Sequence, residues 1–264
     1  MTGFSADWLR RREPFDAAAR DMTLARRFAI ELGDARNRPR RLVDLAAGSG
    51  ASFRALAPLI AGDQDWLLVD NDPLLIAAQA AQIKRWSAAN GWQCEAFSGG
   101  LSVRAGSAEW RARSCTLDLA QGVEQVHFAE CDGVTTSAFL DLVSAAWLEQ
   151  LRAVLVRNSL PLLATLTVDG RRAWAPSLPA DVRIDRAFRQ HQSRDKGFGP
   201  AQGGLAAQDL GSRLTAEGYE VTTARSDWRI GAAHRDMLLH MVEESAARGD
   251  TALRGPWAAR PPTP

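Results

Sequence analysis

Cysteine is scarce in this chain of 264 residues, which holds only Cys94, Cys115 and Cys131. The count is odd and no two of them form a Cys-x-x-Cys pair, so the sequence indicates neither a disulfide framework nor a zinc knuckle. We therefore expect the three thiols to pack as small apolar side chains in a reducing compartment, and no metal site is expected.

The chain also lacks an excess of charge of either sign. Its 32 lysines and arginines nearly balance 31 aspartates and glutamates, which leaves a formal net charge of +1. Without a strong overall field, the composition favours neither a nucleic acid nor an acidic membrane surface as a partner. A basic cluster, RNRPRR at 36–41, precedes the first expected strand, where we expect it to be solvated.

No apolar run approaches the length that would cross a membrane. The first residues, MTGFSADWLRRREPFD, carry charges where a signal peptide would need an apolar centre. A cytoplasmic protein without a membrane partner is therefore expected. The length fits one α/β domain, or one domain with a small appended subdomain.

Apolar runs of strand length alternate with helical patterns along most of the chain. We expect strands at 42–46, 66–69, 113–117, 134–137 and 162–168, with weaker candidates at 219–224 and 228–230. Helices are expected at 51–59, 74–90, 139–156, 181–192, 205–217 and 233–247. This alternation predicts a mostly parallel, doubly wound sheet with right-handed crossovers and helices on both faces.

The residues before this alternating region indicate a helical cap. Between 5 and 32, apolar residues recur among Arg, Asp and Ala, which predicts one or two amphipathic helices interrupted near Pro14. We therefore divide the chain into an N-terminal helical cap at 1–36, an α/β domain at 37–250 and a tail at 251–264 that we expect to be disordered.

The segment RRLVDLAAGSGASFRAL at 40–56 places a carboxylate, Asp44, in a buried strand and follows it with two glycines. In doubly wound sheets a ligand lies beyond the carboxyl ends of the strands. Gly48 and Gly50 permit a sharp turn there and leave backbone N–H groups open to a ligand. Phe53 stands where a dinucleotide site needs its third glycine, and no P-loop run is present.

What remains is a DxxxGxG pattern, formed by Asp44, Gly48 and Gly50, and an acidic residue, Asp70, at the end of the second expected strand. VDLAAGSG resembles the first motif of class I S-adenosylmethionine-dependent methyltransferases, and LLVDNDP resembles their second. The resemblance extends over residues 40–170. It implies a Rossmann-like, seven-stranded fold, S-adenosyl-L-methionine as the cofactor and S-adenosyl-L-homocysteine as the product.

The resemblance also implies roles for the residues around the first motif. The glycine loop, which includes Ala46, Ser49 and Gly50, would lie against the methionine and ribose parts of the cofactor. Asp44 would orient this loop or the cofactor's amino group. A simpler interpretation of Asp44 is a cap on the following helix.

Further roles are implied at the ends of later strands. Asp70, with Asn71 beside it, would accept hydrogen bonds from both ribose hydroxyls, although Asp70 is also a plausible turn residue. Asp118 would meet the adenine amino group, and Leu119 would offer a backbone N–H. Ser137 would lie beside the reactive methyl group.

Two residues are candidate general bases on the acceptor side. Asp141 follows the fourth expected strand by four residues and could instead balance a helix dipole. His191 lies in FRQHQSRDKGFGP, within a segment at 171–204 whose glycines permit closure over an acceptor.

Three further residues are candidates for contact with the acceptor. Lys196 and Phe198 belong to the same expected lid as His191. In the N-terminal cap, Arg12 or Arg20 would be able to reach a carboxylate, since a guanidinium pairs with a carboxylate in two-point geometry. Solvated helix charge is the commoner explanation of such arginines.

The activity expected from this resemblance is methyl transfer to an oxygen or nitrogen atom of a small molecule. TTSAFLD, after the fourth expected strand, lacks the proline-containing run with which DNA amino-methyltransferases clamp a flipped base. The alternatives are a non-catalytic cofactor-binding or scaffold protein of the same fold, or a methyltransferase acting on protein or nucleic acid. The acceptor and the oligomeric state are left open.

Overall fold

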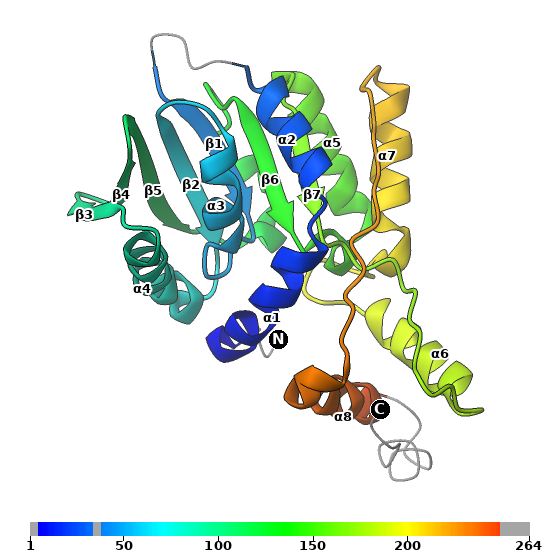
Figure 1. Ribbon diagram of the computed structural model, residues 1–264. Coiled ribbons are helices and arrows are strands. Elements are labelled where there is room, and N and C mark those ends of the chain that lie inside the picture. The colour runs from blue at the N-terminus through cyan, green and yellow to red at the C-terminus, as the bar shows by residue number, and fades with distance from the viewer. Residues whose placement is uncertain (1–4, 34–37, 249–264) are drawn as a thin grey trace.

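A computed structural model describes residues 5–33 and 38–248, and the tail expected at 251–264 lies outside these residues. The described chain forms one seven-stranded sheet in the order β3-β4-β5-β2-β1-β6-β7, with helices on both faces (Figure 1). The strands are β1 (Arg40–Leu45), β2 (Gln64–Asp70), β3 (Gln93–Phe97), β4 (Gly100–Ala105), β5 (Ala108–Thr116), β6 (Gly133–Ser137) and β7 (Leu162–Thr165). The expected Rossmann-like sheet is confirmed.

Eight α-helices lie within the described residues. They are α1 (Ala6–Ala19), α2 (Met22–Glu31), α3 (Ala51–Leu56), α4 (Pro73–Ala89), α5 (Ala145–Asn158), α6 (Asp181–Gln192), α7 (Ala206–Ala216) and α8 (Arg235–Arg248). Short 3₁₀ turns extend several strand ends, among them η2 (Leu119–Gln121) after β5 and η4 (Leu140–Leu142) after β6. In this part of the chain, no helix combines the length and the apolar character that spanning a bilayer requires.

Pro14 does not interrupt the first helix, contrary to the expectation from the sequence. α1 continues through it, and the break comes at Arg20, whose backbone is extended, before Asp21 caps α2. Proline removes one helical hydrogen bond, but the ion pair of Arg12 with Asp16, at 2.8 Å, spans the position and stabilises the helix there.

Residues 93–116 form three strands, of which only the last overlaps a strand expected from the sequence. β3 and β4 form a hairpin, β4 turns back into β5, and both pairings are antiparallel. Gly99 and Gly106 occupy the two tight turns and have positive φ angles of 95° and 63°, respectively. Such turns require this backbone conformation. Two strands are thereby added at the β5 edge of the sheet.

The opposite edge differs from the expectation as well. The segments 219–224 and 228–230 form no strand, so β7 is the outer strand on that side. Side chains hold this part of the chain instead. Arg27 of α2 pairs with Glu220, and Arg27 Nη1 donates to Thr222 Oγ1 at 2.7 Å. The prediction of strands at 219–224 and 228–230 was wrong because the backbone of these segments pairs with no neighbouring strand.

The sheet separates two apolar cores. Val43 and Leu45 of β1 pack into the core beneath α5 and α7, whereas Leu42 packs into the core beneath α2, α3 and α4. Because side chains alternate along a strand, Asp44 points to the same face as Leu42. That alternation directs its carboxyl towards α2 and α3.

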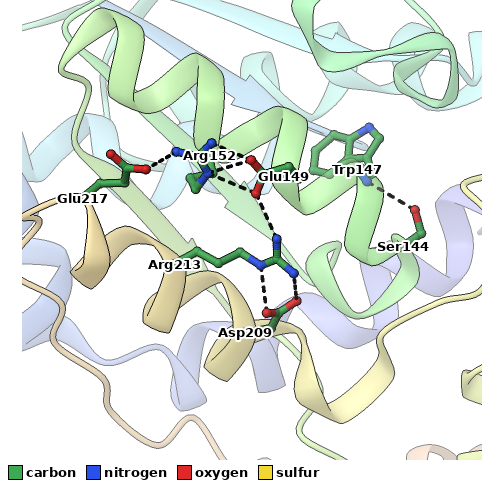
Figure 2. Close-up of polar contacts among 7 residues, drawn as sticks. All are labelled: Ser144, Trp147, Glu149, Arg152, Asp209, Arg213 and Glu217. Carbon is green, nitrogen blue, oxygen red and sulfur yellow. Dashed lines mark hydrogen bonds and ion pairs between the residues drawn. The ribbon is translucent and has the colours of Figure 1, made fainter.

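Ion pairs fasten α7 to α5 (Figure 2). Arg213 of α7 donates from Nη1 to Glu149 of α5 at 2.9 Å and from Nε to Asp209 at 2.8 Å. Arg152 joins Glu149 to Glu217, which follows α7. Hydrogen bonds from Arg152 and Arg213 lower the pKa of Glu149 to about 2. The network therefore stays charged at neutral pH and fixes the position of α7.

Gly100→Ala tests the added hairpin. A Cβ at Gly100 would lie 2.1 Å from the backbone oxygen of Ala112 in β5, and that backbone cannot move without breaking the pairing. We expect the free energy of unfolding, measured in urea, to fall by about 2 to 3 kcal/mol. The matched control is Gly231→Ala, where nothing lies within 4 Å of an added Cβ; equal stability of the two variants would contradict the β4–β5 pairing.

Candidate functional site

The order of the strands along the sheet reverses between β1 and β6, although these two strands are parallel. Chain order runs outward from β1 through β2 on one side, and from β6 to β7 on the other. The carboxyl ends of these parallel strands meet at one edge, and the reversal point of such a sheet is where ligands bind. Asp44 of β1 and Thr135 of β6 lie opposite each other across this reversal.

Strained backbone marks the same edge. Ala46, Ala138 and Leu166 directly follow or lie just beyond β1, β6 and β7, and each has a positive φ, between 52° and 57°. Side chains other than glycine rarely adopt this conformation, and such strain clusters at functional sites. No composition or periodicity signal would have revealed these three positions, since strain arises only from the surrounding fold.

The glycine loop after β1 has the geometry that the sequence suggested. Gly48 and Gly50 have φ values of 54° and 79°, which glycine adopts without steric cost. Gln79 Nε2 donates to the Gly48 carbonyl at 2.9 Å, and Arg54 Nη1 donates to the Ser49 carbonyl at 2.6 Å. The loop is thereby fixed from beneath by two buried side chains that sequence reasoning did not identify.

α1 covers this loop from the other side. A Cβ placed on Gly48 would lie 3.0 Å from Leu9 Cδ1, and Glu13 of α1 pairs with Arg54 of α3 at 2.6 Å. The first helix of the N-terminal segment therefore lies against the glycine loop.

Asp70 closes β2 directly beside the glycine loop. Its Oδ2 accepts from the Gly48 N–H at 2.7 Å, and its Oδ1 accepts from the Asp72 N–H at 3.0 Å. Each carboxylate oxygen can accept a second hydrogen bond. Asp70 is thus both a structural partner of the loop and a carboxylate with spare acceptor capacity at the ligand-binding edge.

The end of β5 lies next to the end of β2. Asn71 Nδ2 donates to Asp118 Oδ1 at 3.4 Å, and Asp118 also caps η2 by accepting from the Ala120 N–H at 3.0 Å. Leu119 is buried, and its carbonyl accepts from Trp147 Nε1 at 2.8 Å. The fold thus brings Asp70, Asn71 and Asp118 together, as the order of the strands implied.

Asp44 is fully buried and only partly paired. Thr135 Oγ1 donates to its Oδ1 at 2.7 Å, while its Oδ2 accepts no hydrogen bond from the described residues. Burial raises the pKa of Asp44 to about 7, although Thr135 and the charge of Arg20 partly offset this effect. Since the N-cap of α3 is Gly50, Asp44 does not cap that helix.

Arg20 is the second incompletely paired charge near this point. It follows α1, is 7% exposed, and donates from Nη1 to Thr165 Oγ1 of β7 at 2.8 Å, while its Nε has no partner among the described residues. Its charge interacts with that of Asp44. A buried carboxylate oxygen and a buried guanidinium nitrogen, both unsatisfied, fit the ammonium and carboxylate of an amino acid.

Asp141 lies in η4, after β6, and is 4% exposed. Burial raises its pKa to about 6, although the Val168 N–H and the charge of Arg12 oppose this rise. A carboxylate with a pKa near 6 is a competent general base at neutral pH. Ser137, at the end of β6, is half-buried and four residues away.

A large cavity of about 2170 Å³, which we call the trough, opens beside β7 and reaches Asp141. Arg12, His191 and Lys196 also line it, but Asp44, Gly48, Asp70 and Asp118 do not. All of the candidate acceptor residues except Phe198 therefore lie around one cavity. The candidate cofactor residues lie at the adjoining strand ends.

The remaining acceptor candidates differ in their surroundings. His191 lies in the last turn of α6, and its carbonyl accepts from Lys196 Nζ at 2.8 Å. Phe198 packs against Phe139 and Trp147, with ring centroids 5.3 and 6.0 Å apart, and does not line the trough. Arg12 is held by Asp16 and lies 5.1 Å from the centre of the Trp228 ring.

No protein-family model and no curated protein matches this sequence. Among solved structures, the chain is similar to the plantazolicin methyltransferase BpumL in complex with SAH, with 12% identity, a TM-score of 0.38, and coverage of 80% of this chain and 65% of that one. The chain thus spans slightly less than two thirds of the length of BpumL.

Two further solved structures are similar to the chain. The [4+2]-cyclase SpnF has 18% identity and a TM-score of 0.45, with 90% of this chain and 73% of that one covered. SAM-bound CalS10, an amino pentose methyltransferase from Micromonospora echinaspora, has 16% identity and a TM-score of 0.33, with 67% and 59% covered. None of the three reaches a TM-score of 0.5, so a function for this chain has to come from its own residues.

The buried carboxyl predicts a pH-dependent stability. An unfolded chain loses the Asp44 proton near pH 4, whereas the folded chain keeps it until about pH 7. Between these values the unfolded state binds fewer protons, so the free energy of unfolding falls as pH rises from 4 to 7 and then levels off. Asp44→Asn is expected to remove the contribution of Asp44 to this decrease in the free energy of unfolding, which is on the order of 4 kcal/mol.

The measurement is urea unfolding of the wild type and Asp44→Asn at intervals from pH 4 to pH 8. Asp141 contributes a fall of the same sign, but it is present in both proteins and cancels in the comparison. Parallel stability curves for the two proteins would show that Asp44 is ionised throughout this range.

Proposed function

We propose that this chain is an S-adenosylmethionine-dependent methyltransferase that transfers a methyl group to an oxygen or nitrogen atom of a small molecule. One observation carries the proposal. The glycine loop, which has positive φ angles, contacts the Asp70 carboxylate near the point where the strand order reverses. Two buried groups of opposite charge, on Asp44 and Arg20, lie nearby, and each has an atom without a hydrogen-bond partner among the described residues.

These residues fit the parts of the cofactor one by one. Asp70 would accept hydrogen bonds from the two ribose hydroxyls, and the polar groups of Asn71 and Asp118 would face the adenine. Asp44 Oδ2 would accept from the methionine ammonium, and Arg20 would donate to the methionine carboxylate. The contacts to the sugar and to the amino acid are charge-assisted, which makes them strong and specific.

The glycine loop, including Ala46, Ser49 and Gly50, would lie along the middle of the cofactor. α1 would enclose the cofactor from above, since Leu9 already lies against Gly48. An enclosed site excludes water and aligns the reacting groups, and methyl transfer depends mainly on such alignment.

The cofactor, when bound, supplies an electrophilic methyl group on a sulfonium. Ser137 and the strained Ala138 lie at the end of β6, between the cofactor residues and the trough. Asp141, at the start of the trough, would take the proton from an acceptor hydroxyl or amine. His191, with Lys196 beside it, is the second candidate for this role, and 171–204 would form the acceptor-side lid.

Asp70→Asn tests the sugar contact. We expect the affinity for S-adenosylmethionine, measured by calorimetric titration, to fall about 10- to 150-fold, because a charge-assisted hydrogen bond is worth roughly 1.5 to 3 kcal/mol. Asp65→Asn is the matched control, since Asp65 lies on the same strand and pairs with Arg113 at its other end.

Two results would count against this assignment. Equal affinities of Asp70→Asn and the wild type would remove Asp70 from the sugar site. If the wild type itself gave neither heat nor thermal stabilisation with millimolar S-adenosylmethionine, the methyltransferase proposal would fail.

Arg20→Met tests the amino-acid contact. We expect the affinity for S-adenosylmethionine to fall at least about tenfold, since the variant loses a buried charge-assisted pair. Decarboxylated S-adenosylmethionine lacks the group that Arg20 would bind, so its affinity is expected to be the same for Arg20→Met and the wild type. Arg26→Met, at an exposed position of α2, is the control. An equal loss for both ligands would mean that Arg20 acts only through the fold.

A further inference from the structure

The trough extends well beyond the point of reaction. It begins at Ala138 and Asp141, after β6, and continues along the edge strand β7 as far as Ser159 and Pro161 at the other end of that strand. In the opposite direction it reaches residues of α6 and α8. The cavity is therefore elongated and meets the strand ends at Asp141.

Its size exceeds that of an ordinary small-molecule site. Pockets that enclose drug-sized ligands have volumes of roughly 300 to 1,000 Å³, whereas the trough measures about 2170 Å³. A compact metabolite would fill only part of it and would leave much of the apolar lining in water. The volume favours a long acceptor.

The lining is rich in large apolar side chains. Aromatic rings are distributed along the trough and belong to elements far apart in the chain: Trp8, Phe28, Trp174, Phe188, Tyr219 and Trp228. Burial of apolar surface against such rings is the main attraction that they offer a ligand.

Several charged side chains in the lining are paired within the protein. Arg12 is bound by Asp16, Arg27 by Glu220, and Arg171 by both Asp169 and Asp227. A guanidinium already bound to a carboxylate offers little field to a phosphate or carboxylate of a ligand. The pairing favours an uncharged acceptor over a nucleic acid or a phosphorylated compound.

One wall of the trough is a segment that side chains hold in place. Between residues 220 and 230 no backbone-to-backbone hydrogen bond is formed with the rest of the described chain. Trp228 Nε1 donates to Asp16 Oδ1 at 3.0 Å, and its ring packs against Trp8 and Phe15. Such a wall can yield to a long ligand without breaking the sheet.

We propose that the trough binds the methyl acceptor, and that this acceptor is an elongated, uncharged and mainly apolar molecule whose hydroxyl or amino group reaches Asp141. This inference rests on the proposed function, because only a methyltransferase would use the bound molecule as a methyl acceptor. The chemistry and length of the ligand rest on the trough alone.

The test uses the uncharged apolar fluorophore N-phenyl-1-naphthylamine and its displacement by straight-chain 1-alkanols from hexanol to tetradecanol. We expect saturable binding of the fluorophore. The affinity of the alkanols is expected to rise about fourfold for each added methylene, the usual gain for a buried CH₂, through tetradecanol. A plateau before decanol would overturn the elongated site.

Ala164→Trp locates the binding. Ala164 lies on β7 in the lining of the trough and is exposed, so an indole there would block the cavity at its centre. We expect at least a tenfold loss of fluorophore affinity. Ala96→Trp, at an exposed position of the opposite edge strand β3, is the matched control and is expected to bind as the wild type does. Equal binding by both variants would overturn the assignment.

Ala207→Trp provides the same block from α7 and is used where Ala164→Trp does not fold, since Ala207 is also exposed and lines the trough.

A titration of the same proteins with S-adenosylmethionine distinguishes failure of this inference from failure of the proposed function. Cofactor binding without apolar binding would overturn this inference alone. Apolar binding without cofactor binding would overturn the proposed function and the identification of the ligand as an acceptor.

Discussion

The carboxyl of Asp44, buried where the sheet reverses direction, is the constraint around which the candidate site is arranged. A charge in that position is costly unless it is paired, and among the described residues it meets the hydroxyl of Thr135 at 2.7 Å, the nearby hydroxyl of Ser52 and the charge of Arg20. A side chain kept under such conditions is better explained by a ligand than by stability. The interaction also joins β1 to β6 across the line along which such sheets bind their ligands.

Two regions with different chemistry meet at the carboxyl edge of the sheet. The strand ends of β1, β2 and β5 carry carboxylates, glycines and an amide, a polar set suited to a nucleoside with an amino-acid tail. The trough beside β7 carries aromatic rings and internally paired charges. Asp141 lies where the second region begins, so it would stand between the proposed cofactor and the proposed acceptor.

The two edges of the sheet differ in how they are covered. The strands β3 and β4 lengthen the sheet at the edge remote from the trough, whereas β7 pairs only with β6 and lines the cavity. Ion pairs between α5 and α7 fix one wall, whereas the segment at 220–230 is held by side-chain contacts. The cavity is thus rigid on one side and yielding on the other.

Local patterns in the sequence were enough to predict β1, β2, β5, β6 and β7, the glycine loop and the acidic end of β2, because burial and backbone freedom act on a few neighbouring residues at a time. The same patterns misplaced two strands at 219–230 and missed the hairpin of β3 and β4, since pairing of strands depends on partners distant in the chain. Only the tertiary structure brought Arg20 to Asp44, fixed the loop through Gln79 and Arg54, and opened the trough. Most of those features arise from contacts between residues distant in the chain, such as Gln79 and Gly48, which no local periodicity records.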